Sequence, residues 1–195
     1  MRDLNLKNIN LILKEYKKKK YEETPWIDKE LNVIIPMAGK GSRFVSAGYT
    51  FPKPLIEIAG KPMIQCVIEN LNLIAKFIFI IQKEHQKKYN IISLLKTLKP
   101  DCKIIILDKV TEGAACTALL AKQLINNKNP LLIANSDQYI VWNSNNTLYK
   151  FHNRGYDGGI ITFKASHPKW SYARTDDTNM VLEVAEKKVI SNNAT

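Results

Sequence analysis

Apolar positions in residues 1–30 recur at helical spacing, with polar and charged residues between them. The residues that set this spacing are Leu6, Ile9, Leu13 and Tyr16. The pattern predicts one amphipathic helix followed by a linker, and we expect the four lysines at positions 17–20 to form its solvated end. The helix could pack on the rest of the chain or on a partner subunit, so a homo-oligomer stays open.

From residue 31 the pattern changes to strands that alternate with helices. Short apolar runs predict strands at 31–36, 77–81, 103–107 and 131–134. Apolar residues spaced three and four apart predict helices at 63–74, 84–98 and 113–125. Three less regular runs, at 159–165, 172–175 and 181–185, are also typical of strands. This order predicts a Rossmann-like three-layer α/β/α sandwich with a mostly parallel sheet, and we expect one domain at 31–195.

The composition favours a single domain inside the cell. The 195 residues, 45% of them hydrophobic, are enough for one substantial core. No apolar run approaches the roughly 18 to 20 residues of a membrane span, and the first residues do not open a secretion signal. Cys66, Cys102 and Cys116 include no closely spaced pair, as expected of reduced thiols. We therefore expect a cytoplasmic protein without a membrane partner.

The formal net charge of +11 raises the question of a nucleic-acid partner. The excess comes mainly from scattered lysines in a chain also rich in asparagine and isoleucine, as an AT-rich genome would encode. Nucleic-acid binding relies on arginines and clustered aromatic residues, and the sequence has no such cluster. A nucleic-acid partner is therefore not expected.

Ligands of open parallel sheets bind at the carboxyl ends of the strands, so the chemistry is expected in the loops after residues 36, 107 and 134. The first of these loops contains Gly39 and Gly41, followed by Arg43 and later by Lys53 between two prolines. Glycines let a backbone approach an anion, and Arg and Lys neutralise phosphate charge. Gly-x-Gly alone is equally typical of a tight turn, and it fits neither the dinucleotide fingerprint nor the P-loop.

The complete string resembles the opening signature of the sugar-phosphate nucleotidylyltransferase family. It reads Gly-x-Gly-Ser-Arg-Phe, then Pro-Lys-Pro-Leu, then Gly-Lys-Pro-Met, in order. The resemblance implies that Lys53 stabilises the transition state and that Arg43 assists it. It also implies nucleotide-binding roles for Met37, Ala38, Gly39, Gly41, Ser42 and Arg43.

Asp137 follows the predicted strand at 131–134, where a carboxylate could hold Mg²⁺ against phosphate oxygens. Taken alone, an aspartate after a strand is more often a turn or a helix cap. The resemblance implies that Asp137 is the family's metal-binding and catalytic aspartate. It also implies that Ser136 contacts the nucleotide, with Asn135 and Gln138 as neighbours.

The loop after residue 107 is expected to face the nucleobase. The resemblance implies that Gly113 lets the base approach and that Thr111 lies beside it, although Thr111 could instead cap a helix. Several family members carry a base-reading glutamine where this chain has Asp108. We include Asp108 among the expected nucleotide contacts. Because an aspartate replaces the glutamine, the sequence does not decide whether the donor is CTP, UTP or dTTP.

On the acceptor side, Glu186 and Lys187 resemble the family's Glu-Lys pair, and Trp170 could line the same pocket or belong to the core. Sugar-specific members carry a glycine where this chain has Ser171, so the acceptor need not be a hexose phosphate. No second metal-binding aspartate follows before Thr195. We therefore expect a truncated acceptor region, a site that a partner completes, or impaired activity.

The sequence thus predicts a Mg²⁺-dependent enzyme that transfers CMP, UMP or dTMP from the triphosphate to a phosphorylated small molecule. Residues 111–116, 135–138 and 170–172 resemble a bacterial branch associated with surface polysaccharide, which includes a CTP:phosphoglutamine cytidylyltransferase. Sugar 1-phosphates and non-sugar phosphates stay open as acceptors. The alternatives are a catalytically incomplete nucleotide-binding or regulatory domain and, less expected, a nucleic-acid-binding protein.

Overall fold

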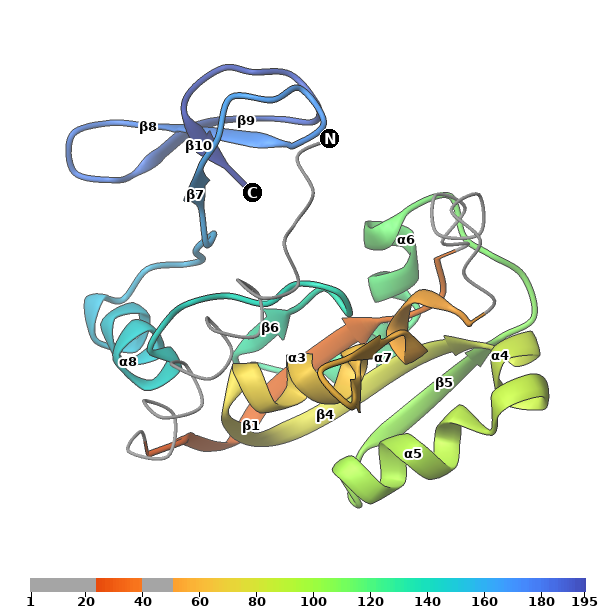
Figure 1. Ribbon diagram of the computed structural model, residues 1–195. Helices are drawn as coiled ribbons and strands as arrows, with labels where there is room; N and C mark the ends of the chain where they lie inside the picture. The colour runs from red at the N-terminus through yellow and green to blue at the C-terminus, as the bar shows by residue number, and fades with distance from the viewer. Residues whose placement is uncertain (1–23, 40–50) are drawn as a thin grey trace. The chain divides into compact units, whose positions relative to one another are not determined.

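The computed structural model describes residues 24–39 and 51–195, so the predicted N-terminal helix lies outside the described residues. The chain divides into two compact units, residues 1–148 and 149–195 (Figure 1). The predicted domain at 31–195 spans parts of both units. Among the helices of the described ranges, none is both long and apolar enough to cross a membrane.

A four-stranded parallel sheet forms the centre of the first unit (Figure 1). Its strands are β1 (Trp26–Pro36), β4 (Leu73–Gln82), β5 (Lys103–Leu107) and β6 (Leu131–Ile133). Their order across the sheet is β5-β4-β1-β6, and β1 pairs in parallel with both β4 and β6. After β1 the chain therefore adds β4 and then β5 on one side of β1, and it returns to add β6 on the other side. This arrangement confirms the predicted fold class, and it makes the gap between β1 and β6 a topological switch point.

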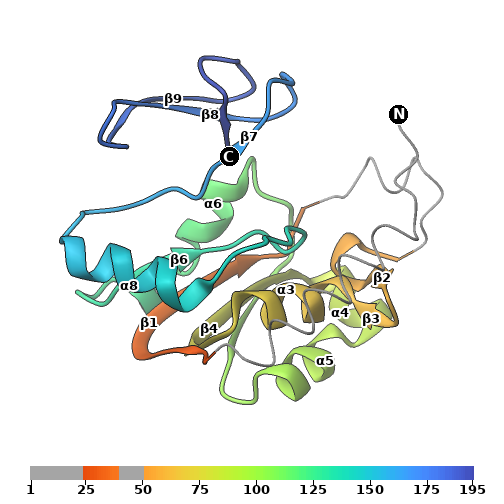
Figure 2. The ribbon, with the colours of Figure 1, turned by 60° about the vertical axis from the view of Figure 1, so that its left-hand side comes forward.

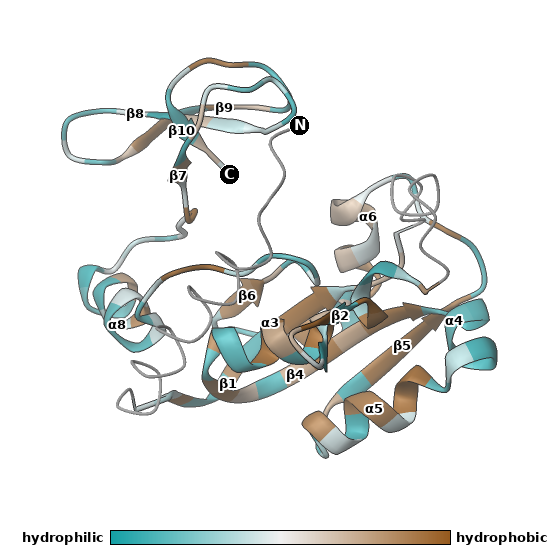
Figure 3. Cartoon of the chain, in the orientation of Figure 1, coloured by the Kyte–Doolittle hydropathy of each residue, from teal (hydrophilic) through white to brown (hydrophobic). Residues whose placement is uncertain are grey.

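Side chains alternate between the two faces of the sheet, and helices cover both faces. Val33, Ile35 and Phe79 point to the face that packs against α3 (Met63–Leu71) and α5 (Ile91–Leu98). Ile34 and Ile80 point to the opposite face, where α6 (Ala114–Leu119) and α7 (Lys122–Ile125) pack. Figure 2 shows α6 and α3 on opposite sides of the sheet, and Figure 3 shows the apolar character of β1 and β4. Because both faces are buried, these strands are almost continuously hydrophobic.

Two asparagines end helices earlier than the apolar spacing predicts. Asn72 adopts a φ of 51°, so the helix predicted at 63–74 ends at Leu71 and β4 begins directly afterwards. Asn90 adopts a φ of 48° and separates α4 (Lys83–Tyr89) from α5 within the single helix predicted at 84–98. Asparagine enters the left-handed region more readily than most residues, which allows both breaks.

Other elements also differ from their predicted bounds. The helix predicted at 113–125 is divided into α6 and α7. β1 begins at Trp26, inside the segment predicted as linker, and a bulge between Ile27 and Asn32 interrupts its pairing with β4. Asp28 stabilises this irregularity, since its carboxylate accepts hydrogen bonds from the backbone N–H groups of Glu30 and Leu31.

Short elements connect β1 to α3, and a helix that the sequence did not predict follows β6. The connection contains the 3₁₀ turn η1 (Lys53–Leu55) and the small hairpin β2 (Glu57–Ile58) and β3 (Lys61–Pro62). The unpredicted helix is α8 (Ser144–Arg154), within which the boundary between the two units falls. Its residues are mostly polar, and so the apolar spacing gives little sign of it.

The second unit is built around an antiparallel sheet. Its strands are β7 (Phe163–Lys164), β8 (Tyr172–Thr175), β9 (Val181–Ala185) and β10 (Asn193–Ala194), in the order β7-β10-β8-β9. Tyr172 is fully buried, and its hydroxyl donates a hydrogen bond to the carbonyl oxygen of His167 at 2.8 Å. The strands predicted at 172–175 and 181–185 are confirmed, whereas the one predicted at 159–165 is reduced to two residues.

Candidate active site

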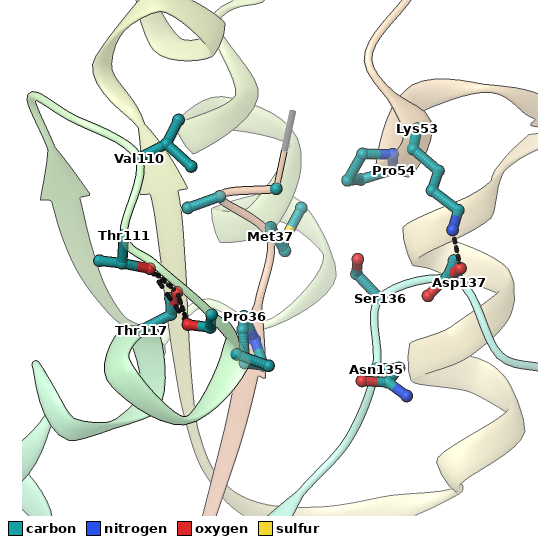
Figure 4. Close-up of a pocket in the computed structure, with 14 residues that line it drawn as sticks. Pro36, Met37, Lys53, Pro54, Val110, Thr111, Thr117, Asn135, Ser136 and Asp137 are labelled. Atoms are coloured by element: carbon teal, nitrogen blue, oxygen red, sulfur yellow. Dashed lines mark hydrogen bonds and ion pairs between the residues drawn. The ribbon is translucent and has the colours of Figure 1, made fainter. Parts of the chain in front are cut away.

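The loops that follow β1, β5 and β6 line one pocket in the first unit, with a volume of about 280 Å³ (Figure 4). These are the three loops in which the sequence placed the chemistry, and they meet because the strands are parallel and neighbouring. The residues that line the pocket are Pro36, Met37, Ala38, Gly39, Lys53, Pro54, Val110, Thr111, Gly113, Ala114, Thr117, Asn135, Ser136 and Asp137.

Lys53 and Asp137 form an ion pair at the wall of this pocket (Figure 4). Among the fourteen lining residues they are the only charged ones. Lys53 opens η1 between Pro52 and the buried Pro54, so its backbone has little freedom. Asp137 lies in the loop that leaves β6. Their side chains are 32% and 27% exposed, which leaves both groups within reach of a ligand in the pocket.

The backbone of Ala38 and Gly39 is held in place from the neighbouring strand. The side-chain amide of Gln82, the last residue of β4, donates hydrogen bonds to the carbonyl oxygens of Ala38 at 2.7 Å and Gly39 at 3.1 Å. A Cβ added to Gly39 would meet no heavy atom within 4 Å. Packing against the described residues therefore does not require this glycine, and the open space beside it leaves room for a ligand to approach the backbone.

The wall opposite Lys53 carries two threonine hydroxyl groups. Thr111 and Thr117 are hydrogen-bonded to one another through their hydroxyls, and the Thr117 hydroxyl donates to the carbonyl oxygen of Gly113 at 3.0 Å (Figure 4). Gly113 precedes the first residue of α6, where no side chain caps the helix. Thr111 therefore does not act as the N-cap that the sequence left open, and it contributes to the pocket wall instead.

Not every residue of the predicted site is among the described residues that line this pocket. Gly41, Ser42 and Arg43 fall outside the described residues. Asp108 is not among the lining residues, and its carboxylate pairs with the ammonium group of Lys83 at 2.6 Å. This hydrogen bond and the positive charge of Lys83 lower the pKa of Asp108. A direct contact between Asp108 and a nucleobase stays a prediction without support from the described pocket.

The predicted acceptor residues belong to the second unit. Glu186 and Lys187 follow β9 and form an ion pair with one another at 3.0 Å. Trp170 packs its ring edge-on against Phe163 with 5.1 Å between centroids, and the Lys169 ammonium group lies 4.7 Å from the Trp170 centroid. Their roles toward an acceptor stay predictions.

The oxygen donors of the pocket fit Mg²⁺ that arrives with a triphosphate. Asp137 supplies a carboxylate, Asn135 an amide oxygen and Ser136 a hydroxyl. In the described part of the chain no three His, Cys, Asp or Glu side chains gather as a metal cage. Mg²⁺ is commonly held by one or two protein carboxylates together with substrate phosphates and water, so one aspartate is sufficient for such a site.

The sequence did not single out Pro36, Val110, Ala114 or Thr117 as pocket residues. Thr117 lies one helical turn after Gly113, so it could have been found by placing the start of α6 at the pocket and counting four residues forward. No feature of the sequence could have identified Val110 in the same way, because its position depends on the path of the loop after β5.

We compared the chain with protein families and with curated proteins. The model of the family described as "Nucleotidyl transferase" matches residues 32–190. The chain is 28% identical over 160 residues to the bifunctional protein GlmU of Methanococcus maripaludis, covering 80% of this chain and 36% of that protein. The chain thus spans about a third of the length of the curated relatives it matches.

Solved structures agree in fold. A nucleoside-diphosphate-sugar pyrophosphorylase from Vibrio cholerae RC9 superposes with a TM-score of 0.67 at 25% identity, covering 84% of this chain and 70% of that chain. An inositol-1-phosphate CTP transferase from T. maritima superposes with a TM-score of 0.62 at 13% identity, covering 84% and 66%. The family model covers most of the chain, and this chain therefore belongs to the nucleotidyl transferase family.

Proposed function

We propose that this protein transfers a nucleotidyl group from a nucleoside triphosphate to a phosphorylated small molecule and releases pyrophosphate. The single observation that carries the proposal is the Lys53–Asp137 ion pair in a pocket at the carboxyl ends of β1, β5 and β6. A cation for phosphate and a carboxylate for a metal ion are the two charges that this reaction requires. Membership of the nucleotidyl transferase family supports the same reaction.

In the proposed reaction, an oxygen of the acceptor phosphate attacks the α-phosphorus of the triphosphate. A new phosphorus–oxygen bond forms as the bond to the β-phosphate breaks, and pyrophosphate leaves. Lys53 offsets the negative charge that develops on the phosphate oxygens, and the backbone around Gly39 lets the triphosphate approach. Mg²⁺ held by Asp137 and the phosphates would neutralise further charge on the leaving pyrophosphate.

We propose a pyrimidine triphosphate, CTP, UTP or dTTP, as the donor. Thr111, Gly113 and Thr117 form the wall of the pocket assigned to the base, and Gly113 offers space beside its backbone because an added Cβ would meet nothing within 4 Å. The two hydroxyl protons are used in hydrogen bonds within this wall, so the threonine oxygens offer acceptor lone pairs. The amino group of cytosine and the ring N–H of uracil or thymine can each donate to such an acceptor.

The proposed acceptor is either a sugar 1-phosphate or a non-sugar phosphate such as phosphoglutamine. Glu186, Lys187 and Trp170 are the residues proposed to contact it. Both kinds of acceptor have precedent among proteins of similar fold, since one is described as complexed with UDP-glucose and another as an inositol-1-phosphate CTP transferase. We further propose that the product is a precursor of surface polysaccharide, made in the cytoplasm where nucleoside triphosphates are available.

The test is a screen of the full chain with CTP, UTP, dTTP and ATP, each combined with hexose 1-phosphates, inositol 1-phosphate and phosphoglutamine, in the presence of Mg²⁺. Pyrophosphate release is followed, and calorimetry measures triphosphate binding in parallel. The proposal expects release with a pyrimidine triphosphate only when an acceptor is present. Tight triphosphate binding without turnover with any acceptor would instead favour a nucleotide-binding or regulatory domain.

A further inference from the structure

Asn70, a residue of α3 outside the pocket lining, holds the segment that follows Asp137. Asn70 is only 2% exposed. Its side-chain amide donates a hydrogen bond to the carbonyl oxygen of Ile140 at 2.8 Å and accepts one from the Ile140 backbone N–H at 2.9 Å. The indole N–H of Trp142 also donates to the backbone carbonyl oxygen of Asn70 at 3.2 Å. One buried residue thus satisfies both backbone groups of Ile140.

This contact matters because residues 134–142 form neither a helix nor a strand. At the start of the segment, the backbone N–H of Ala134 donates to the carbonyl oxygen of Ile34 in β1 at 3.0 Å. At its end, Ile140 is held by Asn70. Asp137 lies between these two attachments. The carboxylate is ion-paired with Lys53, and the backbone that carries it is attached to the sheet on one side and to α3 on the other.

We propose that Asn70 is a positioning residue that holds the Asp137 loop so that its carboxylate faces the pocket. The role in turnover rests on the proposed function, whereas the control of the loop's conformation does not. A buried amide with both hydrogen bonds made is costly to remove and fixes geometry, as partners outside a metal's own ligand shell commonly do. A positional error of about 1 Å at a reacting group can lower a rate by about 10²-fold.

A purely structural role is the competing explanation, and the chain offers a matched control for it. Asn32 in β1 is also 2% exposed. Its side-chain amide donates to the side-chain oxygen of Asn127 at 3.3 Å and to the carbonyl oxygen of Pro130 at 3.4 Å. Asn32 thus fixes the chain just before β6, at the end of that strand opposite to Asp137. Removing either amide weakens a buried contact, but only Asn70 contacts the segment beyond Asp137.

The experiment compares Asn70→Ala and Asn32→Ala in the full chain. Thermal unfolding measures stability, hydrogen exchange measures protection of peptides covering 134–142, and titration with Mg²⁺ and CTP or UTP measures binding. We expect Asn70→Ala to speed exchange in 134–142, to raise the Mg²⁺ concentration needed for triphosphate binding, and to lower kcat by about 10- to 100-fold. Asn32→Ala should lose comparable stability without these changes. Asn70→Thr, which nearly keeps the side-chain volume but lacks the paired donor and acceptor for Ile140, provides a milder variant with a smaller effect in the same direction.

Equal behaviour of the two alanine variants in exchange and in Mg²⁺-dependent binding would overturn the proposal. If Asn70→Ala does not fold, unchanged exchange and binding in Asn70→Thr would overturn it as well. Absence of pyrophosphate release by the unaltered protein would count against the proposed function alone, because hydrogen exchange still decides whether Asn70 holds the loop.

Discussion

The ammonium group of Lys53 and the carboxylate of Asp137 form an ion pair although the two residues lie far apart in the sequence. Lys53 lies in the connection that follows β1, and Asp137 follows β6, which returns to pair with β1 only after β4 and β5 have been formed. The order of the strands therefore creates the charge pair. Each group balances the other's charge in the pocket, so a change at either position is expected to affect how the other meets a ligand.

Replacement of Lys53 by methionine is expected to lower pyrophosphate release by about 10²- to 10³-fold, because one group that stabilises developing charge is lost. Steady-state kinetics should show the loss mainly in kcat. Lys76→Met is the control, since Lys76 pairs with Glu30 at 2.8 Å and does not line the pocket. A Lys53→Met enzyme with the turnover of Lys76→Met would show that Lys53 has no role in the reaction.

Replacement of Asp137 by asparagine keeps the shape of the side chain and removes its charge. We expect turnover to fall by at least about 10²-fold and the Mg²⁺ dependence to shift to higher concentrations, because a neutral amide is a weaker ligand for Mg²⁺ than a carboxylate. Asp28→Asn makes the same chemical change at the β1 bulge, where the side chain only accepts two backbone hydrogen bonds. Identical Mg²⁺ titrations for the two variants would contradict a metal-binding role for Asp137.

Replacement of Gln82 by leucine is expected to weaken triphosphate binding by roughly 2- to 10-fold, the effect of about one hydrogen bond on the placement of the glycine loop. Gln82 holds the carbonyl oxygens of Ala38 and Gly39 from the end of β4. Gln86→Leu is the control, because the Gln86 side chain accepts a hydrogen bond from the backbone N–H of Ile92 at the start of α5. Calorimetric titration with CTP and UTP compares the two, and equal affinities would contradict the prediction.

We expect the free energy of unfolding to decrease as the pH is lowered, because of His85. Burial lowers the pKa of His85 below its ordinary value of 6.5, and its Nδ1 atom is buried with no hydrogen-bond partner among the described residues. The unfolded chain takes up a proton near pH 6.5 while the folded protein does not, so the free energy of unfolding falls as the pH falls below that value. His85→Gln should lose this pH dependence.

Urea unfolding at several pH values between about 8 and 5 measures this change in the free energy of unfolding. The difference between the unaltered protein and His85→Gln should grow toward acid pH. His152→Gln, at an exposed position of α8, is the control and should follow the unaltered protein. Parallel curves for the unaltered protein and His85→Gln would contradict the prediction.

The sequence predicted the sheet well because its strands are buried on both faces. Ile78 and Ile80 face one layer of helices, while Phe77 and Phe79 face the other, so the apolar run is continuous and easily recognised. Helix ends were harder to predict. Asn72 ends a helix through its left-handed backbone conformation, and the spacing of apolar residues carries no information about that conformation. α8 was missed because its mostly polar sequence carries little of the periodic signal.

For the site, residues within a recognisable string could be predicted, and those placed by folding alone could not. Lys53 and Asp137 were both singled out, and the parallel sheet brings them together. Thr117 and Asn70 carry no local signal, since their importance comes from what α6 and α3 pack against. Asp108 was included because it stands where several family members carry a base-reading glutamine; its carboxylate pairs with Lys83, and its contact with a base stays a prediction.

The most direct test of the central claim follows each phosphate of the donor separately. A pyrimidine triphosphate labelled at the α-phosphate is incubated with Mg²⁺ and each acceptor that supports pyrophosphate release, and the products are separated. We predict that the α-label appears in a new nucleotidyl-acceptor compound and that one pyrophosphate is released for each molecule formed. Recovery of the α-label only as free nucleoside mono- or diphosphate, with no labelled acceptor, would contradict nucleotidyl transfer by this protein.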